Sequence, residues 1–331
     1  MANWLIDGYQ AVFFDLDGVV YLGPNAVDGA VAGIADLDAL GVRIAYVTNN
    51  AARPPETVAA HLQSLGINCS AKDIVTSAQA SVRMLAEDLP VGTKILVAGT
   101  EYLADEVRNR GFQVVYNAED APFAVLQGYD PTMTEPRLDE AAYALQNGAV
   151  WYATNTDPSR PTNRGLVPGA GAQISAVGNT VSISPKVAGK PYPPLLQETI
   201  RRVGTAKAIV VGDRLDTDIE GANSVGMDSL FVFTGAHGAK DLLKAPLHQR
   251  PTAIGWDLRA LLAPGRRVRV FENSVSCGQA CVVAEAGAAT FTSIGKSREE
   301  HLDALWALAH LVWQNPDLDY SEAVSMLGQV R

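Results

Sequence analysis

The segment AVFFDLDG, residues 11–18, decides the fold class of this chain. Its apolar half, residues 11–14, is typical of a strand buried on both faces of a parallel sheet. Asp15 and Asp17 follow where such a strand opens into a loop, and Gly18 allows the backbone to turn sharply. Ligands of open α/β sheets bind at the carboxyl ends of the strands. The two carboxylates therefore predict a metal-binding or nucleophilic site, with a plain strand-exit turn as the alternative.

A second predicted strand, over residues 42–48, ends in Thr48, Asn49 and Asn50. Hydroxyl, amide and backbone N–H groups are suited to hold phosphate oxygens. Later in the chain, Lys190 precedes a helical pattern that begins near Pro193. A lysine near a helix N-terminus adds positive charge where anions are already favoured. Both segments therefore indicate phosphate binding, although a strand-end turn and a surface lysine are simpler explanations for each alone.

A further buried strand is predicted over residues 207–211, and it exits into the acidic sequence GDRLDTD. Asp213, Asp216 and Asp218 all lie in this exit. A solvated acidic loop would explain the three carboxylates singly. Polar strand and helix ends that recur in this order along the chain are better explained by one shared site.

Composition excludes several functional classes. The chain has 331 residues, 26 basic and 36 acidic side chains and a net charge of −10, which disfavours nucleic-acid or anionic-membrane partners. No apolar run approaches the ~18 residues of a membrane span, and no secretory signal is recognisable at the N-terminus. The cysteines Cys69, Cys277 and Cys281 form a sparse, odd set that favours a reducing cytoplasm. Cys277 and Cys281 could form half of a metal site, but buried thiols explain them better.

Strand and helix patterns alternate from residue 11 onward, which predicts parallel sheets with helices on both faces. We expect a doubly wound, Rossmann-like α/β core over residues 1–81 and 189–262. Residues 82–188 form a smaller α/β pattern that is expected to be an inserted domain. Within that insert, residues 165–171 are interpreted as a tight turn.

The segment 263–331 has a different pattern. Three short strands are predicted over residues 268–271, 281–286 and 289–294, followed by a helix over residues 297–313. Ser297 and Glu300 have the spacing of a capping box. We expect a small α+β appendage that serves packing or oligomerisation, which leaves a homodimer open.

The motifs DxDG, TNN, GKP and GDRxxTD, in this order and spacing, resemble the haloacid dehalogenase superfamily of phosphatases. The insert resembles the α/β cap of the subgroup that includes phosphoglycolate, glycerol-phosphate and nitrophenyl-phosphate phosphatases. Within that subgroup the chain is most similar to actinobacterial glycerol-3-phosphate phosphatases. The resemblance covers roughly residues 8–262, and the family does not normally carry a segment like 263–331.

The resemblance implies a catalytic role for two carboxylates. Asp15 would attack phosphorus and form an aspartyl-phosphate, which splits a difficult hydrolysis into two steps. Asp17 would protonate the leaving oxygen and then take a proton from the hydrolytic water. The substrate would be a small phosphate monoester, with glycerol 3-phosphate or phosphoglycolate as the first expectation.

The resemblance also implies a set of binding residues. Hard oxygen ligands select Mg²⁺. The metal is expected at Asp15, the backbone carbonyl of Asp17 and Asp213, with support from Asp218 and Gly18. The phosphoryl oxygens are expected at Thr48, Asn49, Asn50 and Lys190.

The cap is expected to recognise the leaving group. The candidates there are Arg160 first, then Asn155 and Tyr129, with Asn163 as a further possibility. Two other functions stay open at this point. One is a phosphotransferase that passes the phosphoryl group to an alcohol, and the other is a non-catalytic sensor of phosphate esters.

Overall fold

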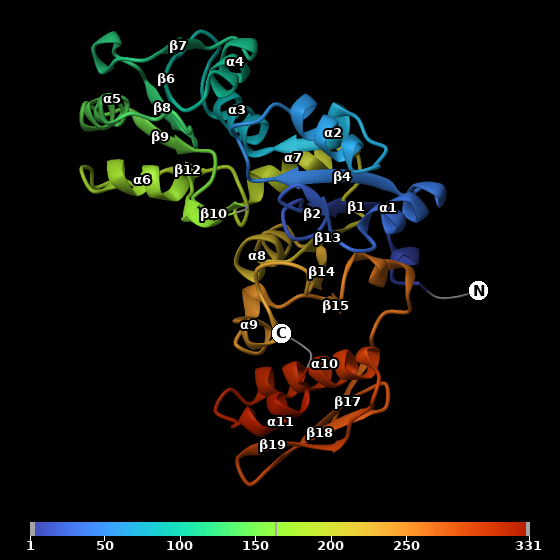
Figure 1. Ribbon diagram of the computed structural model, residues 1–331. Coiled ribbons are helices and arrows are strands. Elements are labelled where there is room, and N and C mark those ends of the chain that lie inside the picture. Colours follow the sequence, from blue (N-terminus) through green and yellow to red (C-terminus); the bar gives the residue numbers. More distant parts are fainter. Residues whose placement is uncertain (1–3, 163, 329–331) are drawn as a thin grey trace. The chain divides into compact units, whose positions relative to one another are not determined.

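The computed structural model describes residues 4–162 and 164–328. Contacts within the chain group it into two units, one made of residues 1–44 and 205–331 and the other of residues 45–204 (Figure 1). This grouping differs from the boundaries expected at residues 81, 188 and 262, which stay predictions. No helix of the described part of the chain combines the length and apolarity needed to cross a membrane.

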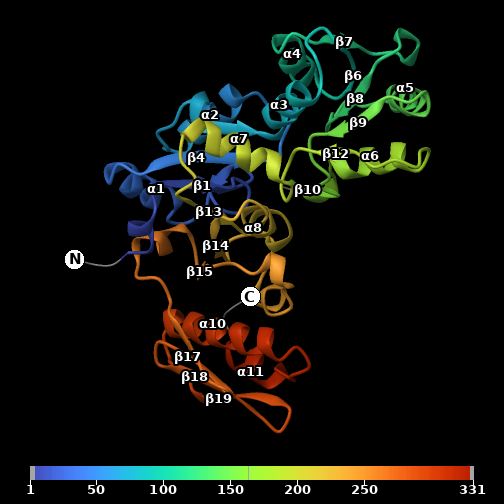
Figure 2. The same ribbon diagram turned by 180° about the vertical axis from the view of Figure 1, so that it is seen from behind.

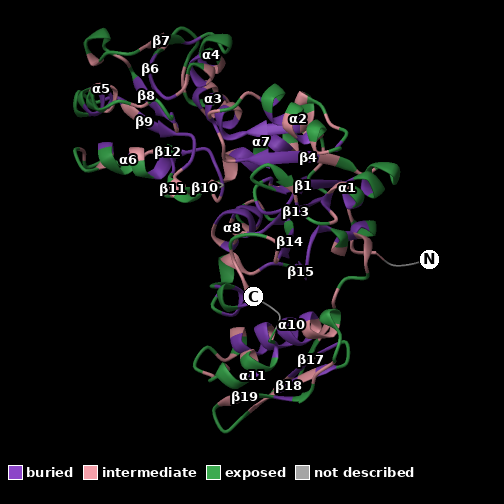
Figure 3. Ribbon diagram, viewed as in Figure 1, coloured by how far each residue is buried: buried purple, intermediate pink, exposed green. Residues whose placement is uncertain are grey.

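The first unit contains a parallel sheet with the strand order β15-β14-β13-β1. The strands are β1 (Ala11–Phe14), β13 (Ala208–Gly212), β14 (Asp228–Val232) and β15 (Ala253–Gly255). Every residue of β1 and β13 is buried, as expected for strands covered on both faces (Figure 3). Phe14 of β1 pairs with Val211 of β13, so the residues that follow these two strands begin at the same edge of the sheet.

Short elements complete this part of the first unit. They are β2 (Tyr21–Leu22), β3 (Asn25–Ala26), α1 (Ala30–Ala39), α8 (Glu220–Ser224) and α9 (Ala239–Leu243). β2 and β3 form a small antiparallel hairpin directly after the first acidic motif. A π-helical turn, Leu215–Ile219, leads from the exit of β13 into α8.

The C-terminal segment of the first unit is a four-stranded antiparallel meander covered by one long helix, which the view from behind also shows (Figure 2). Its elements are β16 (Val268–Val270), β17 (Ser274–Cys277), β18 (Ala280–Glu285), β19 (Ala288–Ser293), α10 (Arg298–Gln314) and α11 (Ser321–Met326). The Ser297 side chain accepts a hydrogen bond from the Glu300 N–H, so the expected capping box is present. Residues of α10 share one hydrophobic core with Phe231 and Leu242 of the parallel-sheet region. The segment therefore packs within its own chain.

The second unit contains a five-stranded parallel sheet with the order β12-β9-β8-β6-β7. Its strands are β6 (Lys94–Ala98), β7 (Gln113–Val115), β8 (Ala124–Gln127), β9 (Val150–Ala153) and β12 (Lys186–Val187). Its helices are α2 (Pro55–Ser64), α3 (Ser77–Asp88), α4 (Glu101–Asn109), α5 (Glu135–Gln146), α6 (Ala170–Gly178) and α7 (Pro193–Val203). Strands β4 (Arg43–Thr48) and β5 (Ile74–Thr76) pair in parallel, precede this sheet in sequence and are not part of it.

The expected α/β class and the α+β character of the C-terminal segment are confirmed. One local expectation was wrong. Residues 165–171 do not form a tight turn, because Gly165–Pro168 is strand β11, which pairs antiparallel with β10 (Ser159–Thr162), and α6 begins at Ala170. The sequence SRPTNRGLVP lacks alternating apolar residues, so nothing in its pattern indicated a hairpin.

Candidate active site

Three aspartates meet at the carboxyl edge of the first unit's parallel sheet. Asp15 follows β1, Asp213 follows β13, and Asp218 lies in the π-helical turn beyond it. Because the Asp15 N–H donates to the Val211 carbonyl at 2.9 Å, the ladder between the strands extends to the aspartate itself. One carboxylate oxygen of each residue lies within 4.8 Å of the others. Asp213 and Asp218 are buried, and Asp15 is partly exposed.

Backbone groups hold two of these carboxylates in place. The Ala236 N–H donates to Asp213 Oδ2 at 2.6 Å, and the Arg214 N–H donates to Asp218 Oδ2 at 3.1 Å. Gly18 has a φ of 94°, and a Cβ at this position would collide with the Asp213 carboxylate. The glycine is therefore required both for the turn and for the close approach of Asp213.

The donor set fits a hard divalent cation. Three carboxylates this close repel one another unless a cation or protons neutralise them. Their oxygens are the ligands that Mg²⁺ prefers. Within residues 4–162 and 164–328 no other cluster of acidic, histidine or cysteine side chains has this geometry. Asp17 contributes no carboxylate to the cluster, and its side chain is exposed.

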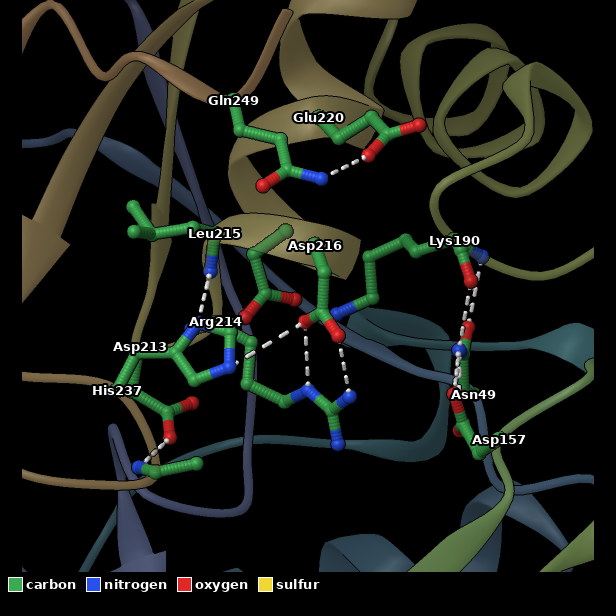
Figure 4. A network of polar contacts seen from close by, with 12 residues as sticks. Asn49, Asp157, Lys190, Asp213, Arg214, Leu215, Asp216, Glu220, His237 and Gln249 are labelled. Carbon is green, nitrogen blue, oxygen red and sulfur yellow. Dashed lines mark hydrogen bonds and ion pairs between the residues drawn. The ribbon is translucent and has the colours of Figure 1, made fainter. Parts of the chain in front are cut away.

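An ion pair between Arg214 and Asp216, with His237 next to it, lies beside the acidic cluster, as Figure 4 shows. Arg214 donates to both oxygens of Asp216, at 3.0 and 2.9 Å. Burial would raise the pKa of Asp216, but the hydrogen bonds and charge of Arg214 outweigh it and lower that pKa below its usual range. His237 Nδ1 accepts the Leu215 N–H at 3.0 Å, and its Nε2 lies 3.8 Å from Asp216. Sequence reasoning missed His237, because no motif in its surroundings indicated a role.

In the second unit, the strand-end residues Thr48 and Asn50 support each other. Thr48 ends β4, is buried and pairs with Thr76 of β5. Its Oγ1 accepts the Asn50 N–H at 3.0 Å, and Asn50 Oδ1 accepts the Ala52 N–H at 2.8 Å. These bonds hold the loop after β4 in a tight polar turn.

Lys190 and Asn49 are brought together although 141 residues separate them. The Lys190 N–H donates to Asn49 Oδ1 at 2.8 Å, and Asn49 Nδ2 donates to the Lys190 carbonyl at 2.9 Å (Figure 4). Lys190 is only 2% exposed, and its Nζ lies 3.3 Å from the Val47 carbonyl. The lysine therefore places its charge near the end of β4, where Thr48 and Asn50 also lie.

The cap candidates fall into two places. Asn155 is buried and donates from Nδ2 to the Asn49 carbonyl at 2.6 Å, so it contacts the strand-end loop. Arg160 is exposed on β10, donates to the Tyr129 hydroxyl at 2.8 Å and lies 4.8 Å over the Tyr129 ring. Asn163 lies outside the described residues.

Comparison with known proteins identifies the family. Models of haloacid dehalogenase-like hydrolases match residues 12–113 and 187–261. The chain is 40% identical to D-glycerol 3-phosphate phosphatase of Mycobacterium tuberculosis over 92% of this chain and 86% of that protein. The chain belongs to the haloacid dehalogenase-like hydrolases. It is also 36% identical to an acid sugar phosphatase of Staphylococcus aureus, over 71% of this chain and 90% of that protein.

A solved structure extends the likeness to the C-terminal segment. The crystal structure of glycerol phosphate phosphatase from M. tuberculosis in complex with magnesium superposes with a TM-score of 0.87 at 38% identity, and the match covers 99% of both chains. This hydrolase therefore shares its α+β appendage with at least one relative. The family was expected not to carry such a segment normally, and this relative is an exception.

Proposed function

We propose that this hydrolase is a Mg²⁺-dependent phosphatase that hydrolyses a small phosphate monoester through an aspartyl-phosphate on Asp15. The main observation in support is that Asp15, Asp213 and Asp218 converge at one sheet edge. Supporting it, the relatives that match most of this chain are phosphatases of the same family. Asp15, the Asp17 carbonyl and Asp213 would hold the cation, with Asp218 beside them and Gly18 leaving room for Asp213. When bound, Mg²⁺ would offset the repulsion between an anionic nucleophile and an anionic substrate.

The two catalytic carboxylates divide the chemistry. Asp15 attacks phosphorus and the ester P–O bond breaks, while Asp17 gives its proton to the departing alkoxide. Water then attacks the phosphorus of the aspartyl-phosphate and gives a proton to Asp17. Free Asp15 and inorganic phosphate result, and Asp17 is protonated again. The exposed position of Asp17 suits a group that must meet both the leaving alcohol and water.

The polar residues at the end of β4 and Lys190 are the groups proposed to bind the phosphoryl oxygens of the substrate. The Thr48 hydroxyl accepts from Asn50 with its oxygen and so keeps its proton for a phosphate oxygen. Lys190 adds a full positive charge in a buried position, where electrostatic interactions are strengthened by the low dielectric. Asn49 and Asn50 complete this group.

Glycerol 3-phosphate is the proposed substrate, because a relative covering 92% of this chain is named for that activity. The stacked pair Arg160 and Tyr129 would recognise the leaving group, and Asn155, which donates to the Asn49 carbonyl, is a further candidate. A panel of phosphate monoesters, including phosphoglycolate, sugar phosphates and nucleotides and ranked by kcat/KM, tests this assignment. A better substrate than glycerol 3-phosphate in that panel would refute it.

Two alternatives are separable in the same assay. Products formed with added alcohols distinguish a phosphotransferase from a hydrolase, and a lack of turnover of every monoester would indicate a sensor.

We also propose that the enzyme acts in the cytoplasm, where its three free thiols would stay reduced, without nucleic-acid or membrane partners. Light scattering of the purified protein tests whether the enzyme is a monomer or the homodimer that the sequence left open.

A further inference from the structure

The side-chain amide of Asn49 has no remaining donor. Its Nδ2 carries two protons. One goes to the Lys190 carbonyl at 2.9 Å, and the other goes to the Asp157 carboxylate, whose oxygens lie at 3.1 and 3.2 Å. Its Oδ1 accepts the Lys190 N–H at 2.8 Å. A direct bond from this amide to a phosphate oxygen would therefore require the loss of a bond that already exists.

We propose that Asn49 is a positioning residue that fixes the main chain of Lys190 and, through it, the ammonium group that binds the phosphoryl group. This inference rests on the proposed function of Lys190 and replaces the direct phosphate contact expected of the Asn49 side chain. The paired bonds to the N–H and carbonyl of one residue act as a two-point clamp on its backbone. Because the lysine side chain is buried, its course from a fixed backbone leaves few alternative positions for Nζ.

The neighbouring glycine supports the clamp. A Cβ at Gly189 would come within 2.7 Å of Asn49 Oδ1 and 2.8 Å of Asn155 Cβ. Such contacts are closer than side chains tolerate, so the amide and the chain before Lys190 approach as nearly as a glycine permits. The sequence Gly189-Lys190 therefore has a packing reason that is independent of any phosphate-binding loop.

Asn49 itself is anchored from two other elements. Its carbonyl accepts the Ser77 hydroxyl at 2.5 Å, from the first residue of α3, and Asn155 Nδ2 at 2.6 Å, from the segment after β9. The clamp is thus held by the strand end, a helix start and the cap segment together. A residue held at so many points is suited to fix the position of another group to within about 0.5 Å.

A double-mutant cycle tests the proposal. Lys190→Ala should lower kcat/KM for glycerol 3-phosphate on the order of 10³-fold, and Asn49→Ala on the order of 10²-fold. The double variant should fall no more than about threefold below Lys190→Ala, because the clamp has nothing left to position. Calorimetric binding of inorganic phosphate to the same four proteins should show the same pattern. Losses that multiply in the double variant would overturn the proposal.

Two further variants control for charge and folding. Asp157→Asn can still accept the Asn49 amide proton, so activity should stay within about threefold of wild type. A loss as large as that of Asn49→Ala would overturn the proposal, because Asp157 would then be the partner that matters. Asn49→Asp keeps the size of the side chain but turns an oxygen toward the Lys190 carbonyl. It should lose at least as much activity as Asn49→Ala, because the new oxygen faces the Lys190 carbonyl and the Asp157 carboxylate, and near-wild-type activity would contradict the clamp.

The proposed function and this inference fail in different ways. A wild-type protein that hydrolyses no monoester would refute the proposed function. In that case, calorimetric binding of inorganic phosphate to the wild type, the two single variants and the double variant would still test the inference, because it needs no turnover.

Discussion

The acidic cluster after β1 and β13 and the helix α10 of the C-terminal appendage lie in the same unit, but the cluster consists of charged side chains and α10 mainly of buried apolar ones. The cluster gathers three carboxylates within 4.8 Å and fixes them through backbone N–H groups. In α10, nine residues are buried and join one apolar core with Phe231 and Leu242. Concentrated like charge opposes folding, whereas buried apolar surface stabilises it. We therefore expect changes in the cluster to alter turnover, and changes in α10 to alter stability.

Asp15→Asn should have the largest effect. Loss of the nucleophile should lower kcat on the order of 10⁴-fold or more, because no neighbouring group replaces an attacking carboxylate. The melting temperature should stay equal or rise, since one of three repelling charges is removed. Steady-state kinetics and a thermal melt measure both. An activity above about a hundredth of wild type would contradict nucleophilic catalysis by Asp15, and with it the expectation that changes in the cluster mainly alter turnover.

Asp17→Asn should have the next largest effect on turnover. The variant keeps the backbone carbonyl but cannot donate a carboxylic proton, so kcat should fall on the order of 10²- to 10⁴-fold for alkyl phosphates. The phosphorylation step should suffer much less with nitrophenyl phosphate, whose leaving group needs no proton. Rapid-quench kinetics with the two substrates checks this. Equal losses for both would contradict the role of Asp17 as the acid.

Trp306→Ala tests the apolar side of the comparison. Trp306 is buried in α10 and makes edge contacts with His310 and Trp313 at centroid distances of 4.5 and 5.6 Å. Its truncation should lower the free energy of unfolding by about 3–5 kcal/mol. The folded fraction should keep wild-type kcat. Denaturant titration with activity assays measures both quantities, and a stable but inactive variant would show that the appendage takes part in the chemistry.

Asp213→Asn should separate charge from packing within the cluster. Mg²⁺ affinity should fall on the order of 10²-fold, because a direct ligand loses its charge. Without metal, the variant should melt at a higher temperature than wild type, since repulsion in the cluster is relieved. The wild-type rise in melting temperature on adding Mg²⁺ should shrink. An unchanged response to Mg²⁺ would place the metal elsewhere.

His310→Phe should produce the smallest effect, confined to acid pH. Burial, and then the charge of Arg250, lowers the pKa of His310 from 6.5 to about 4. The unfolded chain therefore binds the extra proton first, and stability is lost as pH falls from about 6.5 toward 4. Phe cannot titrate, so it should remove about 2 kcal/mol of this acid lability. Denaturant titrations from pH 4 to 7 measure it, and parallel pH profiles of variant and wild type would refute the prediction.

Some features could be predicted from sequence because they depend on local patterns. Asp15 and Asp213 follow apolar runs that form buried strands, and Ser297 and Glu300 have capping-box spacing, so their neighbours in sequence determined their setting. The four-residue strand Ser274–Cys277 was missed, because its small polar residues give a weak strand pattern.

Long-range contacts could not be predicted. The pairing of Asn49 with Lys190 joins residues 141 positions apart, and His237 reaches Leu215 only because the chain returns to the edge of the same sheet. Side-chain bonds of this kind depend on tertiary packing, which leaves no periodic signal in the sequence. The motif identified the charged groups, and the structure revealed what holds them.

Trapping of the covalent intermediate tests the central proposal most directly. The enzyme is mixed with glycerol 3-phosphate and Mg²⁺, quenched with borohydride, which reduces an acyl phosphate to an alcohol, and its peptides are analysed by mass spectrometry. We predict homoserine at position 15, present only when substrate and Mg²⁺ are both added and absent from Asp15→Asn. Reduction at a different carboxylate, or rapid turnover without any reduced residue, would contradict nucleophilic catalysis by Asp15.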